Sequence, residues 1–171
     1  MQRKIVSALL WAIFVGYVLV MVWLLFRPDQ IYRMFTGEWY AERRYNFELF
    51  DTIRRYVISR GSIPEVAMRN LVGNVGVFVP CGLFLQTLRK SKRVWSGLLL
   101  ILLTTAAVEV LQFVLGVGAL DVDDVILNFL GGVLGMMLVG LLRQIWKKNE
   151  DAVRFWVLIL LVVLGVIFIM Q

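Results

Sequence analysis

The sequence predicts an all-α integral membrane protein. Of its 171 residues, 60% are hydrophobic, which exceeds the roughly 45–50% typical of soluble domains. Several apolar stretches reach the roughly 20 residues that a helix needs to cross a bilayer. Charged residues gather in the segments between these stretches, as they do in the loops of membrane proteins. Together these observations predict a single membrane domain, residues 1–171, built from transmembrane helices.

We expect five transmembrane helices. Their apolar runs cover Ile5–Phe26, Leu71–Leu88, Val94–Val117, Val125–Trp146 and Val153–Met170. The first run is longer than the apolar core of a signal peptide, and no small-residue cleavage site follows it, so we interpret it as a retained helix. The second run contains glycines and Pro80, which predicts a kinked or partly re-entrant helix packed against protein.

The short loops predict the orientation of the chain. One loop reads Arg89-Lys90-Ser91-Lys92-Arg93, and another contains Lys147 and Lys148. Because short basic loops remain in the cytoplasm, we expect the N-terminus inside and the C-terminus outside. The acidic connection before the fourth span then faces the exterior.

The long first loop contains a possible amphipathic segment. Apolar residues at helical spacing predict a short helix lying in the outer membrane interface. They are Phe50, Ile53, Tyr56 and Val57, with Asp51, Arg54 and Arg55 on the opposite side. The alternative is a solvated loop whose periodicity is incidental.

The composition excludes several function classes. The chain has no histidine and one cysteine, Cys81. These counts exclude Ser–His and Cys–His catalysis, the usual zinc ligand sets and an intrachain disulfide. The net charge of +6 comes from basic residues beside apolar spans, so it reports topology and does not indicate a nucleic-acid partner.

Polar side chains interrupt the apolar spans, and a carboxylate at membrane depth costs roughly 2.5–3.5 kcal/mol on insertion scales. At about 100° per residue, these residues form one stripe on each of three neighbouring spans. The stripes consist of Asn74 and Cys81; of Thr105, Glu109, Gln112 and Gly116; and of Asp124, Asn128, Gly131 and Gly135. We expect them to meet in one pocket open to the outside, with Glu109 and Gln112 two to three turns below the acidic connection.

Each polar residue also has a structural interpretation. Asp121 or Asp123 would cap the fourth helix, and Asn128 and Gln112 would be hydrogen-bond bridges between helices. Gly131 and Gly135 would allow a neighbouring backbone to approach closely, and Cys81 would be a small buried apolar group. Among them, Glu109 is the hardest to explain without a function, because acids inside membranes are functional by default.

Three chemistries suit such a pocket. Carboxylates and amides are ligands for a divalent cation such as Mg²⁺ or Ca²⁺, with Glu109, Asp121 and Asp124 as the candidate metal ligands. Glu109 and Asp124 could instead divide acid and base roles as catalytic residues. The third alternative is a site that only binds the polar part of an envelope molecule. Asp121, Asp123 and Asp124 are too closely spaced to constitute a metal motif.

Two segments resemble the VanZ family. The first carries the pattern N-x-x-x-F-x-P-x-G at Asn74, Phe78, Pro80 and Gly82. The second carries E-x-x-Q followed by D-x-x-D-x-x-x-N-x-x-G-x-x-x-G, at Glu109, Gln112, Asp121, Asp124, Asn128, Gly131 and Gly135. The resemblance covers about residues 70–140, and residues Asn46 through Phe50 in the first loop resemble the family more weakly. Gly118 stands where many members have an arginine, and the segment Asn46–Phe50 lacks the proline that many members have in it.

The resemblance implies a bacterial cytoplasmic-membrane protein that lowers susceptibility to teicoplanin-type lipoglycopeptides. We interpret the chain as binding or altering an envelope component, such as a lipid-linked precursor, beside its obvious partner, the lipid bilayer. The expected ligand-binding residues are Asn74, Glu109, Gln112, Asp121, Asp124 and Asn128. The alternatives are a metal-assisted hydrolase or transferase acting on a lipid-linked substrate, and a structural subunit without catalysis. The sequence does not specify the oligomeric state.

Overall fold

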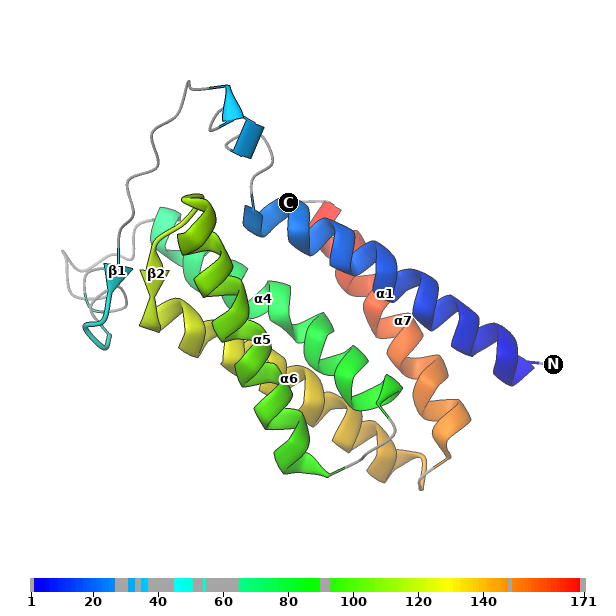
Figure 1. Cartoon of the computed structure of the whole chain (residues 1–171). Helices are drawn as coiled ribbons and strands as arrows, with labels where there is room; N and C mark the ends of the chain where they lie inside the picture. Colours follow the sequence, from blue (N-terminus) through cyan, green and yellow to red (C-terminus); the bar gives the residue numbers. More distant parts are fainter. Residues whose placement is uncertain are drawn as a thin grey trace.

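The computed structural model describes residues 2–26, 31–32, 35–36, 45–50, 54, 65–89, 93–147 and 149–169. Its main elements are α1 (Gln2–Phe26), β1 (Tyr45–Asn46), α4 (Glu65–Leu88), α5 (Val94–Leu115), β2 (Leu120–Asp121), α6 (Val122–Ile145) and α7 (Glu150–Ile169). The two strands are only two residues long, so the predicted all-α class is confirmed. Figure 1 shows α4, α5 and α6 packed together, with α1 and α7 side by side against them.

In the described part of the chain, four helices are long and apolar enough to cross a membrane. These segments are Lys4–Phe26, Leu71–Leu88, Val94–Leu115 and Val122–Ile145, and they fit a multi-pass membrane protein. The expected fifth span, Val153–Met170, falls mainly in α7, which is a helix of 20 residues; its passage through the membrane stays a prediction. The expected amphipathic helix at residues 50–57 lies outside the described residues, apart from Phe50 and Arg54.

The second span is one uninterrupted helix. We expected a kinked or partly re-entrant helix packed against protein because of its glycines and Pro80. The re-entrant alternative is wrong, because α4 runs through Pro80 without a break for 24 residues. The expected packing against protein is confirmed at Gly82, which lies against α6. A Cβ atom at Gly82 would lie 1.9 Å from the backbone oxygen of Gly132, so only glycine fits there.

Two glycines of α6 bring its backbone into contact with α4. A Cβ atom at Gly131 would lie 2.1 Å from the carbonyl oxygen of Val75, and one at Gly135 would lie 2.1 Å from that of Val79. The predicted close approach at this small-residue pair is confirmed, and α4 of the same chain is the neighbour. In this way α4 and α6 form the tightest helix pair, which fixes the polar residues of one helix opposite those of the other.

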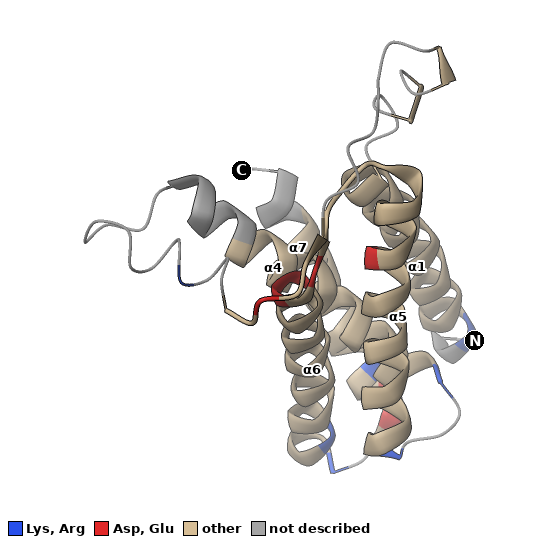
Figure 2. Ribbon diagram, turned by 60° about the vertical axis from the view of Figure 1, so that its left-hand side comes forward, with Lys and Arg blue, Asp and Glu red and all other residues tan. Residues whose placement is uncertain are grey.

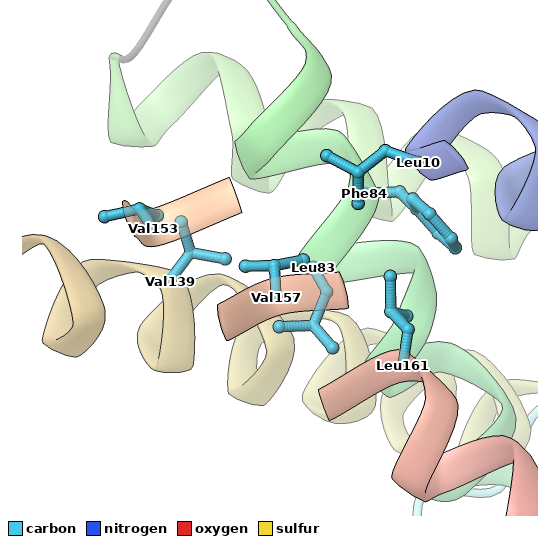
Figure 3. Packing of buried hydrophobic residues seen from close by; sticks show 7 residues of the cluster. All are labelled: Leu10, Leu83, Phe84, Val139, Val153, Val157 and Leu161. Carbon is cyan, nitrogen blue, oxygen red and sulfur yellow. The ribbon is translucent and has the colours of Figure 1, made fainter. Parts of the chain in front are cut away.

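The remaining helices attach to this pair through an apolar core. Figure 3 shows side chains from α1, α4, α6 and α7 packed together: Leu10, Leu83, Phe84, Val139, Val153, Val157 and Leu161. A polar contact adds to this core, because the Tyr17 hydroxyl of α1 donates to the carbonyl oxygen of Val77 at 2.9 Å. At the end of the bundle that carries the α6–α7 connection, Arg143 forms a salt bridge with Glu150 at 3.0 Å.

Candidate functional site: a polar cluster between three helices

The connection from α5 to α6 folds back along α5. Gly116 ends α5 in the left-handed conformation, with φ 67°, a backbone geometry that glycine adopts without strain. The returning chain places the backbone N–H of Asp121 3.5 Å from Oε2 of Glu109. Since α5 continues six residues beyond Glu109, to Leu115, β2 lies roughly 9 Å back along the helix. The predicted depth is therefore wrong: Glu109 is level with the acidic connection.

Glu109 of α5 faces Asn128 of α6. Both side chains are buried, with 3% and 1% of their surfaces exposed. The Asn128 amide Nδ2 donates to Glu109 Oε1 at 3.4 Å, which is longer than the usual 2.7–3.2 Å. The other amide atom, Asn128 Oδ1, is buried without a hydrogen-bond partner among the described residues. These two groups are the least satisfied polar pair of the site.

Asp124 connects α6 to α4. The Asn74 amide Nδ2 donates to Asp124 Oδ1 at 2.5 Å, and both residues are half-buried. Because the glycine contacts between α4 and α6 lie about two to three turns further along α6, the helix spacing at Asn74 and Asp124 is set by those contacts. Figure 2 shows the acidic residues of this region at one end of α5 and α6, and basic residues around the loops at the other end.

Asp121 caps α6, so the structural interpretation of this residue is confirmed. Its Oδ1 accepts a hydrogen bond from the Asp123 backbone N–H at 2.8 Å, the usual arrangement at a helix N-cap. Its Oδ2 also accepts from the Asn46 amide at 3.3 Å. Asp121 therefore has a second structural contact, which holds part of the first loop.

Asp123 was considered only as a possible helix cap, and its contact with the first loop was not predicted. It is fully buried, and its Oδ1 accepts from the backbone N–H of Phe50 at 2.7 Å. Next to it β1 pairs with β2 in parallel, with Tyr45 opposite Leu120 and Asn46 opposite Asp121. The only signal for this contact in the sequence was the weak resemblance to the family at Asn46 through Phe50, because two-residue strands have no recognisable sequence pattern.

Gln112 lies outside this cluster. Its amide Nε2 donates to the carbonyl oxygen of Leu25 at 2.7 Å, so it bridges α5 to the end of α1, as its structural interpretation predicts. Cys81 is buried against Phe78 and Val108, which agrees with its interpretation as a small apolar group. The polar cluster, as we use the term below, consists of Asn46, Asn74, Glu109, Asp121, Asp123, Asp124 and Asn128.

The geometry of the polar cluster suits hydrogen bonding. In the part of the chain that the structure describes, no group of three or more His, Cys, Asp or Glu side chains could hold a metal ion. The metal-ligand and catalytic roles considered for Glu109, Asp121 and Asp124 thus stay predictions from the sequence. The acceptors that lack good donors, on Glu109 and Asn128, match a group that offers N–H or O–H bonds.

The region that matches known proteins contains the polar cluster. The VanZ/LLP1 family model matches residues 14–147, a range that contains every residue of the cluster. Protein VanZ from Enterococcus faecium is 36% identical over 101 residues, which are 58% of this chain and 63% of that protein. The alignment thus spans less than two-thirds of this relative's length. No solved structure matches the chain.

Proposed function

This chain belongs to the VanZ/LLP1 family, and we propose that it lowers bacterial susceptibility to teicoplanin-type lipoglycopeptides by binding an envelope component. The binding residues are Glu109 and Asn128, with Asn74 and Asp124 at the rim. The protein acts in the cytoplasmic membrane and presents this site to the exterior, where such antibiotics meet the cell surface.

The observation that carries the proposal is the unpartnered Asn128 Oδ1. A buried acceptor without a donor costs about 1–3 kcal/mol. The two hydrogen bonds of Glu109, at 3.4 and 3.5 Å, are also longer than usual. A bound group with hydrogen-bond donors would satisfy the acceptor atoms of Glu109 and Asn128 that the protein leaves with long bonds or with none. We therefore expect the bound part of the envelope component to be rich in N–H or O–H bonds, such as an amide, an amine or a sugar.

The residues around Glu109 and Asn128 support access of the envelope component from one side of the membrane. Asn74, Asp121 and Asp124 are half-buried, so the polar cluster reaches the surface of the bundle. The short basic loops that follow α4 and α6 lie at the opposite end. Since such loops remain in the cytoplasm, the polar cluster faces outward.

The test is a susceptibility assay in a teicoplanin-sensitive bacterium that expresses the chain. We expect Glu109→Gln to abolish protection against teicoplanin, because the substitution replaces one acceptor oxygen with a donor. The amount of protein in the membrane should be unchanged, because the shape of the side chain is kept. Asp151→Asn is the matched control, since it neutralises an exposed acid at the far end. Protection by Glu109→Gln equal to that of the control would refute the proposed site.

A further inference from the structure

The segment Tyr45–Phe50 is attached to the polar cluster through its backbone. Phe50 donates its N–H to Asp123, and β1 pairs with β2. Within the segment, Asn46 Oδ1 accepts from the Glu48 backbone N–H at 3.1 Å. Phe50 has a positive φ of 61°, which is uncommon for a bulky residue, so its bond to Asp123 holds an unfavourable conformation in place.

The apolar side chains of this segment point away from the protein. Tyr45, Phe47, Leu49 and Phe50 are between 56% and 68% exposed. The rings of Tyr45 and Phe47 contact each other, with their centroids 5.5 Å apart. A soluble surface seldom carries so many apolar groups in six consecutive residues, and such patches mark interaction surfaces.

The position of the segment indicates what covers it. β1 lies beside β2, and β2 lies beside the last turns of α5 and does not extend beyond them (Figure 1). At this level the exposed side chains of α5, such as Leu111 and Val114, belong to a candidate membrane span. The segment therefore lies at a level of the bundle where the surface of the protein contacts lipid.

We propose that Tyr45–Phe50 is inserted into the lipid of the membrane that the helices span, in the leaflet at the polar-cluster end, with its aromatic side chains among the lipid chains. Non-helical backbone at this depth requires hydrogen-bond partners from the protein. The Asp123 side chain and the β1–β2 pairing supply such partners, while Asp121 holds the Asn46 side chain. Aromatic residues are enriched where membrane meets water. The acids thus have a structural role, independent of ligand binding: they allow an irregular segment to sit beside lipid.

Fluorescence quenching in lipid vesicles tests this placement. A nitrobenzoxadiazole label on Phe47→Cys, in a Cys81→Ala background, is exposed either to lipids carrying a nitroxide near the glycerol end of one chain or to aqueous iodide. We expect the lipid nitroxide to remove most of the fluorescence and iodide to remove little. A label on Lys147→Cys, in the loop between α6 and α7, should show the reverse. Leu49→Cys is a second labelling site in case Phe47→Cys folds poorly.

Each other outcome overturns the proposal. Quenching of both segment labels by iodide alone would place the segment in water. Protection from both quenchers would show that a second copy or another protein surface covers it. Asp123→Ala removes the acceptor for Phe50, so in this variant the Phe47→Cys label should pass from lipid quenching to iodide quenching. An unchanged pattern would show that the acid does not hold the segment.

Discussion

Adding one methyl group at Gly131 should force α4 and α6 apart. The Cβ atom of Gly131→Ala would lie 2.1 Å from the carbonyl oxygen of Val75, whereas real Cβ contacts essentially never fall below 3.0 Å. The difference, 3.0 − 2.1, requires the two backbones to separate by at least 0.9 Å. Neither backbone can rotate away as a flexible side chain would. Because Asn74 is next to Val75, the same shift should lengthen its hydrogen bond to Asp124.

Gly140 provides the matched control, because a Cβ atom there meets nothing within 4 Å. Replacing glycine by alanine inside a helix gains up to about 1 kcal/mol from intrinsic propensity alone. Gly131→Ala has the same gain but also overpacks the interface, which costs about 1–3 kcal/mol. The two variants should therefore differ by about 1–3 kcal/mol in unfolding free energy, or about 2–12 °C in Tm at 2–4 °C per kcal/mol.

The assay uses the chain's single cysteine, which is buried. A thiol-reactive dye added to the detergent-solubilised protein reports unfolding when Cys81 becomes accessible on heating. We expect Gly140→Ala to melt at or slightly above the wild-type temperature and Gly131→Ala to melt below both. Equal melting temperatures for the two variants would refute the tight α4–α6 contact on which the geometry of the polar cluster depends.

Three further substitutions separate structural from functional roles. Tyr17→Phe removes the hydrogen bond to Val77 and should lower the unfolding free energy by about 0.6–1.7 kcal/mol, the range for bonds between membrane helices, as the same dye assay will show. Asn128→Ala removes an amide with one long bond and one unpartnered atom, so it should change stability by less than about 2 kcal/mol yet abolish protection in the susceptibility assay. Asp123→Asn retains an oxygen that can accept from Phe50 and should keep more protection than Asp123→Ala.

Much of the framework could be predicted from the sequence, because hydrophobic runs and helical periodicity are local properties. The runs located the helix ends to within three residues, except that α4 begins six residues before the predicted Leu71. The periodicity placed Asn74, Glu109, Asp124 and Asn128 on facing sides. The spacing of Gly131 and Gly135 also predicted close backbone packing, which the contacts with α4 confirm.

The sequence could not predict the position of one element along the axis of another. Periodicity defines the face of a helix, but it does not define the level at which a connection returns. The left-handed Gly116 turns the chain back along α5, and this brings the acidic connection down to the level of Glu109. Gln112 was misplaced for a related reason: its partner, the carbonyl oxygen of Leu25, lies far away in sequence and carries no side-chain signal.

The contacts divide the acids of the polar cluster into two groups. Asp121 caps α6 and, with Asp123, holds the first loop, and Asp124 ties α4 to α6; each of these acids has a short hydrogen bond within the protein. Among the described residues Glu109 has only long ones, and it is buried beside the unpartnered Oδ1 of Asn128. A loss of function at the aspartates could therefore arise from a disturbed fold, whereas a loss at Glu109 or Asn128 without a loss of stability could not. The pair of measurements, stability and protection, on the same variants is what identifies the binding residues.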